Sequence, residues 1–483
     1  MISENNIFNI LSKYFTSKNK KWLASTKNDN SIIKRIIVVL KKLEIIIMNK
    51  QRRKRGVILT SEGLQNIKDA RSKFEYEQNF GQICTYEKLS QITCLDLNTI
   101  KRVLKCKQGV DKRTLERFFM SFNLELTDDY YTEPNPHKRI DLREAICVLD
   151  FQGRTAELGE LEQWLLKDRC RLVTILGIGG VGKTALSVKL TSHIGNKFDC
   201  VIWRSLKDAL SIDKLLADIL QFLSANQLTE AELPQRTSDK ITCLIEYLRS
   251  LRCLVVLDNL ESLLCDNSEA GVYRQGYEEY GELLKRTGES THQSCLLLTS
   301  REKPTQVAAL EGESLPVRSF KLKGLGQQEG RKILKITGLN CSEPELNHLV
   351  TQCSGNASAL KIIATTIQDI FDGDVAAFLA KKMVVFGDIY KLLDEQFERL
   401  SALEREIIYW LAVNQEPITF PQLQEKMGVT VSELHLIEGL VSLSRRSLIE
   451  AQQSYFALQP IVIEYVLYRF RQTEDSIAIL SEL

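Results

Sequence analysis

The feature that most constrains this chain is the stretch GIGGVGKT at residues 177–184, which lies between the apolar run LVTIL and the segment ALSVKL. Four glycines in eight residues would weaken either a helix or a strand. They suit a loop whose backbone curls tightly and turns its N–H groups inward. With a strand before it and a helix after it, such a loop offers an anion-binding helix N-terminus. The stretch therefore predicts an α/β domain that binds phosphate.

The same stretch matches the pattern G-x-x-x-x-G-K-[ST] from Gly177 to Thr184. In this pattern the backbone N–H groups cradle phosphates, the lysine reaches the β- and γ-phosphates, and the hydroxyl binds Mg²⁺. A glycine turn alone would explain neither Lys183 nor Thr184. The residues predicted to bind the nucleotide here are Gly177, Gly179, Gly180, Val181, Gly182, Lys183, Thr184 and Ala185.

A phosphate-binding loop also needs an acidic residue on a neighbouring strand to hold the metal ion. The run CLVVLD ends in Asp258, and its continuous apolar character is typical of a strand buried on both faces of a parallel sheet. Two more strand patterns occur, around residues 201–203 and in CLLLTSR, which ends in Arg301. Helical patterns separate these strands, which predicts a βαβαβαβ order. Loops at the carboxyl ends should then gather Thr184, Asp258 and Arg301 around one crevice.

Five short motifs give the chain a specific resemblance: FQGRTAEL, the glycine-rich loop, LVVLDN, LLLTSR and CSGNASAL. They resemble the successive motifs of the NB-ARC domain, the ATPase core of STAND signalling proteins, over residues 145–470. The resemblance implies a switch that ADP holds closed and that exchange for ATP opens for assembly or effector contact. It also implies that Asp258 is the Walker B acid, with Mg²⁺ held by Thr184 and Asp258, and that Arg301 reads the γ-phosphate.

Three departures from the family pattern bear on function. Asn259 stands where the family often has a second acid, and an amide can orient water but cannot take its proton. Hydrolysis, with Asp258, Asn259 and Arg301 as the catalytic set, is therefore expected to be slow at most. Glu261 could supply the missing acid, or it could be an exposed glutamate at a helix start.

The other two departures lie further along the chain. The family's GxP motif appears as GNA from Gly355, so the proline that packs on the nucleotide is absent. The Met-His-Asp turn that touches the ADP phosphate is replaced by LQP, with Gln459 at its centre. Gln459 could donate a hydrogen bond to the nucleotide but cannot carry an imidazolium charge, which predicts a weaker ADP lock.

Residues 48–132 predict a helix-turn-helix module, similar to modules that precede nucleotide-binding domains in some bacterial signalling proteins. Helical spacing turns Ile100 and its apolar partners inward and leaves a polar set outward. Amides and cations at the start of a second helix suit contact with base edges and phosphates. Contact with DNA and a role as a protein adaptor both stay open. The outward residues that would meet DNA are Asn98, Thr99, Lys101 and Arg102.

Charge and composition divide the rest of the chain. Residues 1–56 carry fourteen basic and three acidic residues, a net charge of +11, whereas the remainder carries 50 basic and 59 acidic residues, or −9. An abrupt shift at Met48 predicts a poorly ordered basic extension and a possible true start there. A membrane-surface helix and a presequence are the alternatives. The predicted ranges are an extension at 1–47, a linker at 133–144, a core at 145–325, a helical domain at 326–388 and a winged helix at 389–483.

The predicted fold is thus an α/β P-loop NTPase core with a parallel sheet, an all-α domain, a C-terminal winged helix and an N-terminal helix-turn-helix. No run of 18 uncharged apolar residues occurs, which predicts no membrane span. The twelve cysteines form no CxxC pair, which argues against zinc and disulfides and favours the cytoplasm.

The predicted function is an ADP/ATP-dependent switch that responds to an unknown protein partner or sensor subunit, with a possible nucleotide-dependent homo-oligomer. An ATPase that remodels a bound target and a DNA-binding transcription regulator are the alternatives. Slow turnover and bound ADP would favour the switch, and sustained turnover would favour the remodelling ATPase.

Overall fold

The structure is a computed structural model that describes residues 56–77, 79, 82–106, 109–132, 138–266, 269–381, 383–428, 431–452 and 454–472. The chain forms two compact units that divide after Pro136. The basic extension predicted for residues 1–47 lies outside the described residues. Within the described part of the chain, no helix is both long and apolar enough to cross a membrane.

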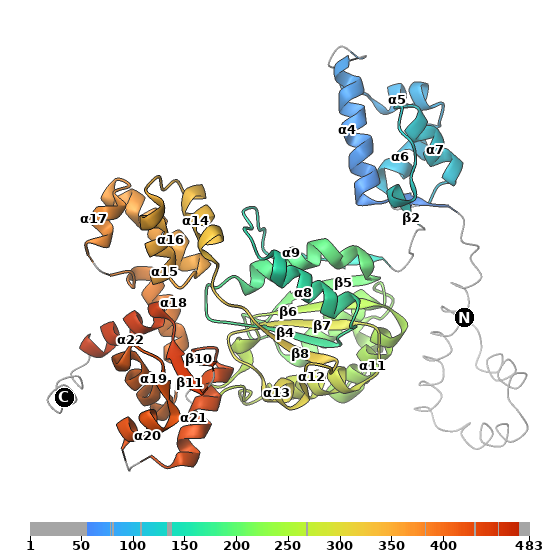
Figure 1. The fold of residues 1–483 in the computed structure, drawn as a ribbon. Coiled ribbons are helices and arrows are strands. Elements are labelled where there is room, and N and C mark those ends of the chain that lie inside the picture. Colours follow the sequence, from blue (N-terminus) through green and yellow to red (C-terminus); the bar gives the residue numbers. More distant parts are fainter. Residues whose placement is uncertain are drawn as a thin grey trace, which may run out of the picture. The chain divides into compact units, whose positions relative to one another are not determined.

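The first unit is a small helical domain (Figure 1). Its core is formed by buried apolar side chains such as Ile100, Leu115 and Phe119. The turn between the second and third helices passes through Cys94 in the left-handed region, and the Asp96 carboxylate then caps the next helix. Its elements are β1 (Ile58–Leu59), α4 (Ser61–Glu77), α5 (Tyr86–Thr93), α6 (Leu97–Lys105), α7 (Lys112–Met120), a short 3-10 helix (Asp128–Tyr130) and β2 (Tyr131–Thr132).

The second unit is built on a six-stranded parallel sheet with the order β3-β5-β6-β7-β4-β8. The four strand patterns identified in the sequence form β4, β5, β6 and β7. The predicted linker at 133–144 is wrong in its second half, because Arg139–Asp141 pairs with β5 as an edge strand. The strands are β3 (Arg139–Asp141), β4 (Leu172–Leu176), β5 (Cys200–Ser205), β6 (Cys253–Asp258), β7 (Cys295–Ser300) and β8 (Val317–Lys321).

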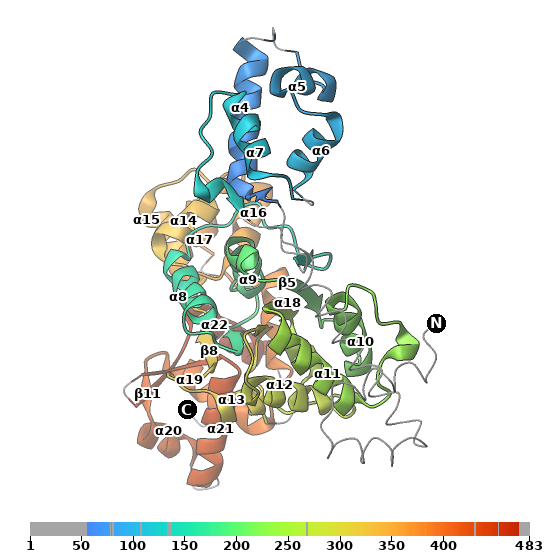
Figure 2. The ribbon, with the colours of Figure 1, turned by 90° about the vertical axis from the view of Figure 1, so that its right-hand side faces the viewer.

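Helices cover both faces of this sheet (Figures 1 and 2). Apolar side chains of α8 and α9 belong to one hydrophobic cluster, and those of α10, α11 and α12 belong to another. Because each face has its own apolar layer, the strands read as continuous apolar runs. The helices are α8 (Thr155–Leu166), α9 (Lys183–Ile194), α10 (Ile212–Leu223), α11 (Thr237–Ser250), α12 (Glu279–Glu289) and α13 (Thr305–Leu310), with 3-10 helices at Gly195–Lys197, Glu230–Glu232 and Leu260–Leu263.

The C-terminal part begins with a helical segment and continues into helices around a three-stranded antiparallel sheet of order β10-β11-β9. The winged-helix assignment of the last part and the boundaries of both predicted domains stay predictions. The elements are α14 (Gln327–Ile336), α15 (Glu343–Gln352), α16 (Ala357–Phe371), α17 (Val375–Leu379), α18 (Gly387–Phe397), α19 (Ala402–Asn414), β9 (Ile418–Thr419), α20 (Phe420–Met427), α21 (Glu433–Arg445), β10 (Ile449–Gln452), β11 (Tyr455–Leu458) and α22 (Pro460–Gln472).

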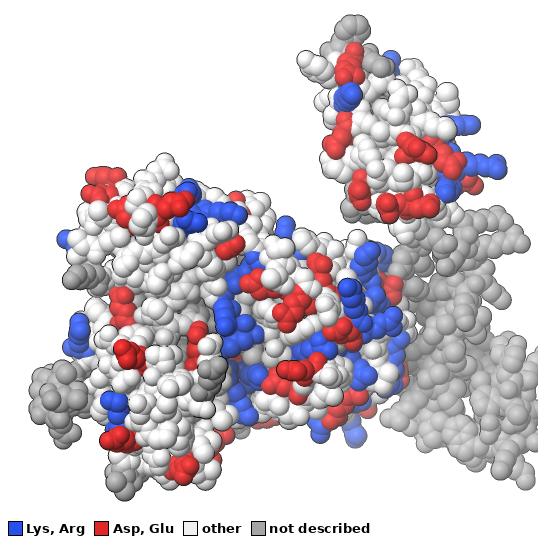
Figure 3. Space-filling view, viewed as in Figure 1, with Lys and Arg blue, Asp and Glu red and all other residues white. Residues whose placement is uncertain are grey.

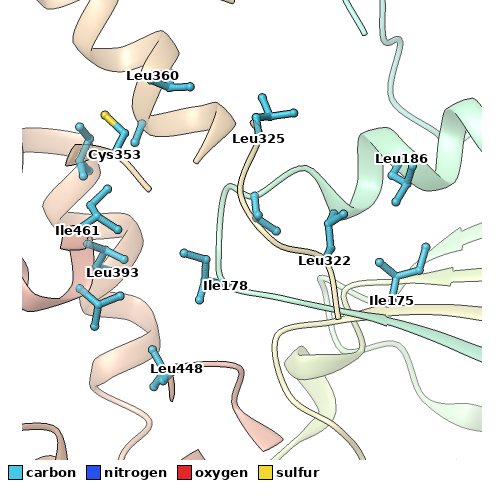
Figure 4. Close-up of a cluster of buried hydrophobic side chains, with 14 of the residues drawn as sticks. Ile175, Ile178, Leu186, Leu322, Leu325, Cys353, Leu360, Leu393, Leu448 and Ile461 are labelled. Atoms are coloured by element: carbon cyan, nitrogen blue, oxygen red, sulfur yellow. The ribbon is translucent and has the colours of Figure 1, made fainter. Parts of the chain in front are cut away.

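One hydrophobic cluster runs from the sheet into this C-terminal part. Figure 4 shows Ile178 of the glycine-rich loop between Leu322, which follows β8, and Leu393 of α18. Ile178 and Leu393 are buried. The glycine-rich loop therefore lies at an internal seam of the second unit.

A buried ion network crosses the same seam. The Glu302 carboxylate accepts hydrogen bonds from Arg446 and Arg399, at 2.5 and 2.6 Å, and Arg446 also binds Glu404 at 2.8 Å. Glu302 and Arg446 are fully buried. Buried ion pairs add less stability than apolar packing but impose a defined geometry, because an unpaired buried charge is costly. The network thus fixes the C-terminal helices on the end of β7.

Candidate functional site

The glycine-rich loop connects the end of β4 to the start of α9, as the sequence predicted. Gly180 and Gly182 adopt φ values of 76° and 106°, which residues other than glycine rarely adopt. The Lys183 ammonium is buried and donates to the carbonyl oxygens of Gly177 at 2.8 Å and Ile178 at 3.1 Å. Lys183 therefore arches back over its own loop, where it can meet an anion.

Thr184, at the start of α9, lies beside Asp258, at the carboxyl end of β6. The Thr184 hydroxyl donates to the Asp258 carboxylate at 2.9 Å, and the Thr299 hydroxyl at the end of β7 donates to the same carboxylate. The side-chain amide of Asn259 donates to it at 3.3 Å. A hydroxyl and a carboxylate beside a phosphate loop form a donor set that suits Mg²⁺. These residues therefore fit a magnesium nucleotide.

Burial shifts the pKa values of both charged groups in this site. Desolvation is the largest cause for Lys183 and lowers the pKa of its ammonium to about 8, although the nearby Glu261 and Asp258 favour its charged form. Desolvation also raises the pKa of Asp258 above its ordinary value, against the hydrogen bonds from Thr299 and Thr184. A bound phosphate and a divalent cation would supply the missing counter-charges, which supports a magnesium nucleotide as the ligand.

Arg301 follows β7 and lies over the loop. Its guanidinium carbon is 3.4 Å from the position that a Cβ on Gly179 would take. The guanidinium pairs with Glu261 at 3.2 Å and with Glu395 of α18 at 3.0 Å. Glu261 is buried beside the site, so its interpretation as an exposed helix-start glutamate is wrong. The structure thus brings Lys183, Arg301 and Glu261 to one place.

Two further site residues from the sequence have protein partners. The backbone of Gly355 packs against the backbone of Leu325 and leaves no room for a side chain, because a Cβ on Gly355 would lie 2.2 Å from the Leu325 carbonyl oxygen. Gln459 lines a small cavity of about 100 Å³ with Gly177, but its amide donates to Glu450 at 3.2 Å. The predicted hydrogen bond from Gln459 to a nucleotide would require this pair to separate.

Sequence reasoning missed several residues that contact the loop. The buried Gln396 of α18 accepts a hydrogen bond from the Gly179 N–H at 3.3 Å. Asn356 donates to the Gly179 carbonyl oxygen at 2.8 Å, and the Ser358 N–H donates to the Gly180 carbonyl oxygen at 3.1 Å. Asn356 could have been found from its place beside Gly355, but α18 reads as an ordinary amphipathic helix and gives no signal.

Arg154 also supports the loop. It belongs to the motif FQGRTAEL, whose sequence alone predicts no contact for it. The buried Arg154 guanidinium donates to the Val181 carbonyl oxygen at 3.3 Å and pairs with Glu157 at 2.8 Å. Its left-handed backbone, with a φ of 62°, turns the chain into α8 at this point. The motif therefore braces the phosphate loop from the side of α8.

Comparison with known families decides what this site belongs to. Residues 154–265, from Arg154 past the Asp258 strand, match the family model described as the NB-ARC domain. The chain contains an NB-ARC domain. The resemblance inferred from the glycine-rich loop and LVVLDN is therefore confirmed for this region, and LLLTSR lies beyond it.

The chain is similar to parts of longer curated proteins. The chain is 40% identical over 446 residues to an uncharacterized WD repeat-containing protein of Nostoc sp. This alignment covers 84% of this chain and 35% of that protein. It is 25% identical over 228 residues to the probable disease resistance protein RXW24L of Arabidopsis thaliana. This alignment covers 44% of this chain and 23% of that protein. The chain thus spans about a third or less of the length of these relatives.

Two solved structures align with about two thirds of the chain. The Walker-type ATPase of Pyrococcus abyssi aligns with a TM-score of 0.48 and 17% identity over 66% of this chain and 96% of that chain. A Signal Transduction ATPase with Numerous Domains (STAND) protein from Pyrococcus horikoshii, which carries a tetratricopeptide repeat sensor, aligns with a TM-score of 0.37 and 19% identity over 68% of this chain and 44% of that chain.

Proposed function

We propose that the chain is a nucleotide-dependent signalling switch that binds ADP or ATP with Mg²⁺ through its NB-ARC domain. The observation that carries the proposal is the Thr184–Asp258 hydrogen bond of 2.9 Å beside the buried Lys183. Lys183 and the loop N–H groups would hold the phosphates, and Thr184 and Asp258 would hold the metal ion. The metal would neutralise phosphate charge, and α18 would keep water away from the loop.

The arrangement supports slow hydrolysis at most. Asn259 cannot accept a proton from water, and its amide is turned toward Asp258. Glu261, the substitute acid considered from the sequence, is paired with Arg301 through both a side-chain and a backbone contact. A switch that resets slowly fits these contacts better than an ATPase that remodels a target through sustained turnover.

The first test is the nucleotide that the purified chain carries. We expect about one equivalent of ADP per chain after denaturation and chromatography, because the loop is covered by α18 and α16 in the closed arrangement. Sustained ATP turnover in the same preparation would favour the remodelling ATPase. An empty site that also fails to bind added ADP would contradict the switch.

We also propose that the first unit makes the output contact, and the exposed cations of α6 support DNA as the partner. Figure 3 shows Lys and Arg on the side of this unit where α7 lies in Figure 1, with Asp and Glu beside them. Lys101 and Arg102 of α6 are exposed, whereas Ile100 between the helices is buried. The alternative is that this unit is an adaptor that binds a protein. Partner recognition by a sensor subunit, nucleotide-dependent homo-oligomers and a cytoplasmic location are further parts of this proposal.

Substitution of Lys101 by alanine should weaken binding of duplex DNA by the full chain. Each lost phosphate contact reduces the slope of log affinity against log salt by about one. Electrophoretic shifts over a salt series measure this slope. Lys73→Ala, on the exposed surface of α4, is the matched control and should leave the slope unchanged. A wild-type chain that shifts no DNA at low salt would favour the protein adaptor.

A further inference from the structure

Two consecutive residues of α18, Glu395 and Gln396, accept hydrogen bonds from donors at the phosphate end of the site. The Gln396 side-chain oxygen accepts from the Gly179 N–H at 3.3 Å. The Glu395 carboxylate accepts from the Arg301 guanidinium at 3.0 Å. Both contacts place an acceptor oxygen against a donor that belongs to the nucleotide-binding core.

These two donors are the kind that a terminal phosphate uses. Loop N–H groups and a cation beside the P-loop lysine stabilise the charge on transferred phosphate oxygens. Arg301 meets this description, because its guanidinium carbon lies 3.4 Å from the Cβ position on Gly179 and its charge acts on Lys183. In the closed arrangement the C-terminal part supplies the Glu395 carboxylate as the anionic partner of Arg301.

The surrounding packing closes the same space. Leu392 of α18 lies 2.7 Å from the position that a Cβ on Gly180 would take. The Gln396 amide nitrogen donates to the Arg446 carbonyl oxygen at 2.8 Å, so the side chain that covers Gly179 is anchored in the C-terminal part. A third phosphate would therefore meet both a carboxylate and a filled volume here.

We propose that Glu395 and Gln396 stand in for the terminal phosphate of a nucleoside triphosphate and make the closed arrangement selective for the diphosphate. This inference rests on the proposed nucleotide switch and adds the residues that distinguish its two nucleotides. A triphosphate competes with Glu395 for Arg301 and repels its carboxylate. Glu395 can yield at small cost, because 63% of its side chain is exposed to solvent.

The same contacts couple the nucleotide to the arrangement of the chain. Arg301 and Glu302 are neighbours, and Glu302 is held by Arg446 and Arg399 of the C-terminal part. Displacement of Glu395 removes the ion pair next to this network and frees Gly179 from Gln396. A triphosphate therefore favours release of α18, and a diphosphate leaves it in place, which is the differential binding that a two-state switch requires.

The test compares ADP with the nonhydrolysable β,γ-imido analogue of ATP, each titrated with Mg²⁺ into nucleotide-free full chain by calorimetry. Glu395→Ala should tighten binding of the imido analogue about fivefold or more and leave ADP affinity within about twofold. Glu395→Gln keeps the size and removes the charge, so it should show a part of the same gain. Asp388→Ala, also on α18 and paired with Lys391 at 3.0 Å, is the matched control and should change neither affinity.

The outcomes separate the two levels of proposal. Equal changes in both affinities, no change in Glu395→Ala, or the same gain in Asp388→Ala would overturn the role of Glu395 while nucleotide binding stands. A wild-type chain that binds neither nucleotide would contradict the switch itself, and with it this inference. Protease sensitivity of the loop before α18 supplies a readout without turnover, since Glu395→Ala should raise it in the presence of the imido analogue.

Discussion

Substitution of Lys183 by alanine is expected to weaken the binding of both ADP and ATP about 30-fold to several thousandfold. The Lys183 ammonium is buried at the start of α9, where it would contact the phosphates. Removal of one partner from a buried, hydrogen-bonded charge pair costs about 2 to 5 kcal/mol. Calorimetry or a fluorescent ADP analogue measures the loss, and the chain should also purify without nucleotide.

The control for this variant is Lys207→Ala, which removes an exposed lysine after β5. It should retain wild-type affinity for ADP. Circular dichroism should show that Lys183→Ala keeps its helices, because the alanine fills less space than the lysine and stays within the helical start of α9. One equivalent of ADP retained by a folded Lys183→Ala variant would contradict the phosphate-loop assignment.

The parts of this site that the sequence predicts are those that local chemistry determines. The strand, the loop and α9 follow from an apolar run, from glycines that need left-handed backbone, and from a lysine at the helix start. Asp258 follows from an apolar run that ends in an acid, because parallel strands bring their carboxyl ends to one edge. Such signals lie within a few residues and need no knowledge of distant contacts.

The parts that the sequence does not predict depend on contacts between distant segments. Gln396 meets Gly179 across 217 positions of the chain, and nothing in the α18 sequence distinguishes Gln396 from a polar surface residue. The sequence does not reveal the edge strand at Arg139–Asp141, because three residues are too few for a periodic pattern. Only the family resemblance predicts that Gln459 lies beside the nucleotide, and only the structure gives its partner, Glu450.

The resemblance to the NB-ARC family and the geometry of α18 give complementary information. The family match covers 154–265, so it identifies the loop and Asp258 but stops before Arg301 and α18. In the structure the same site extends to Arg301, Glu395 and Gln396. The phosphate end of the site is therefore shared between the matched core and the C-terminal part, as a switch that changes its arrangement with nucleotide would need.

Substitution of Asn259 by aspartate is expected to raise the rate of ATP hydrolysis about 100-fold. Asn259 directly follows the Asp258 carboxylate, and its side chain lies 3.3 Å from it, so a carboxylate in its place would sit beside the metal and the attacking water. A positioned general base contributes typically 10²- to 10⁴-fold, and the new carboxylate would share the site with Asp258. The lower end of that range is expected because two neighbouring carboxylates raise each other's pKa unless Mg²⁺ screens them.

The backbone makes this test interpretable. Asn259 has a φ of 64° and a ψ of 49°, and aspartate is one of the few residues that tolerate this left-handed conformation. Asn259→Ala, which has neither acid nor amide, is the control and should stay at or below the wild-type rate. Single-turnover phosphate release separates the chemical step from product exchange. An Asn259→Asp rate equal to wild type would show that a missing base does not limit hydrolysis, and it would direct attention to α18, whose contacts with Gly179 and Arg301 would then hold the triphosphate out of reach.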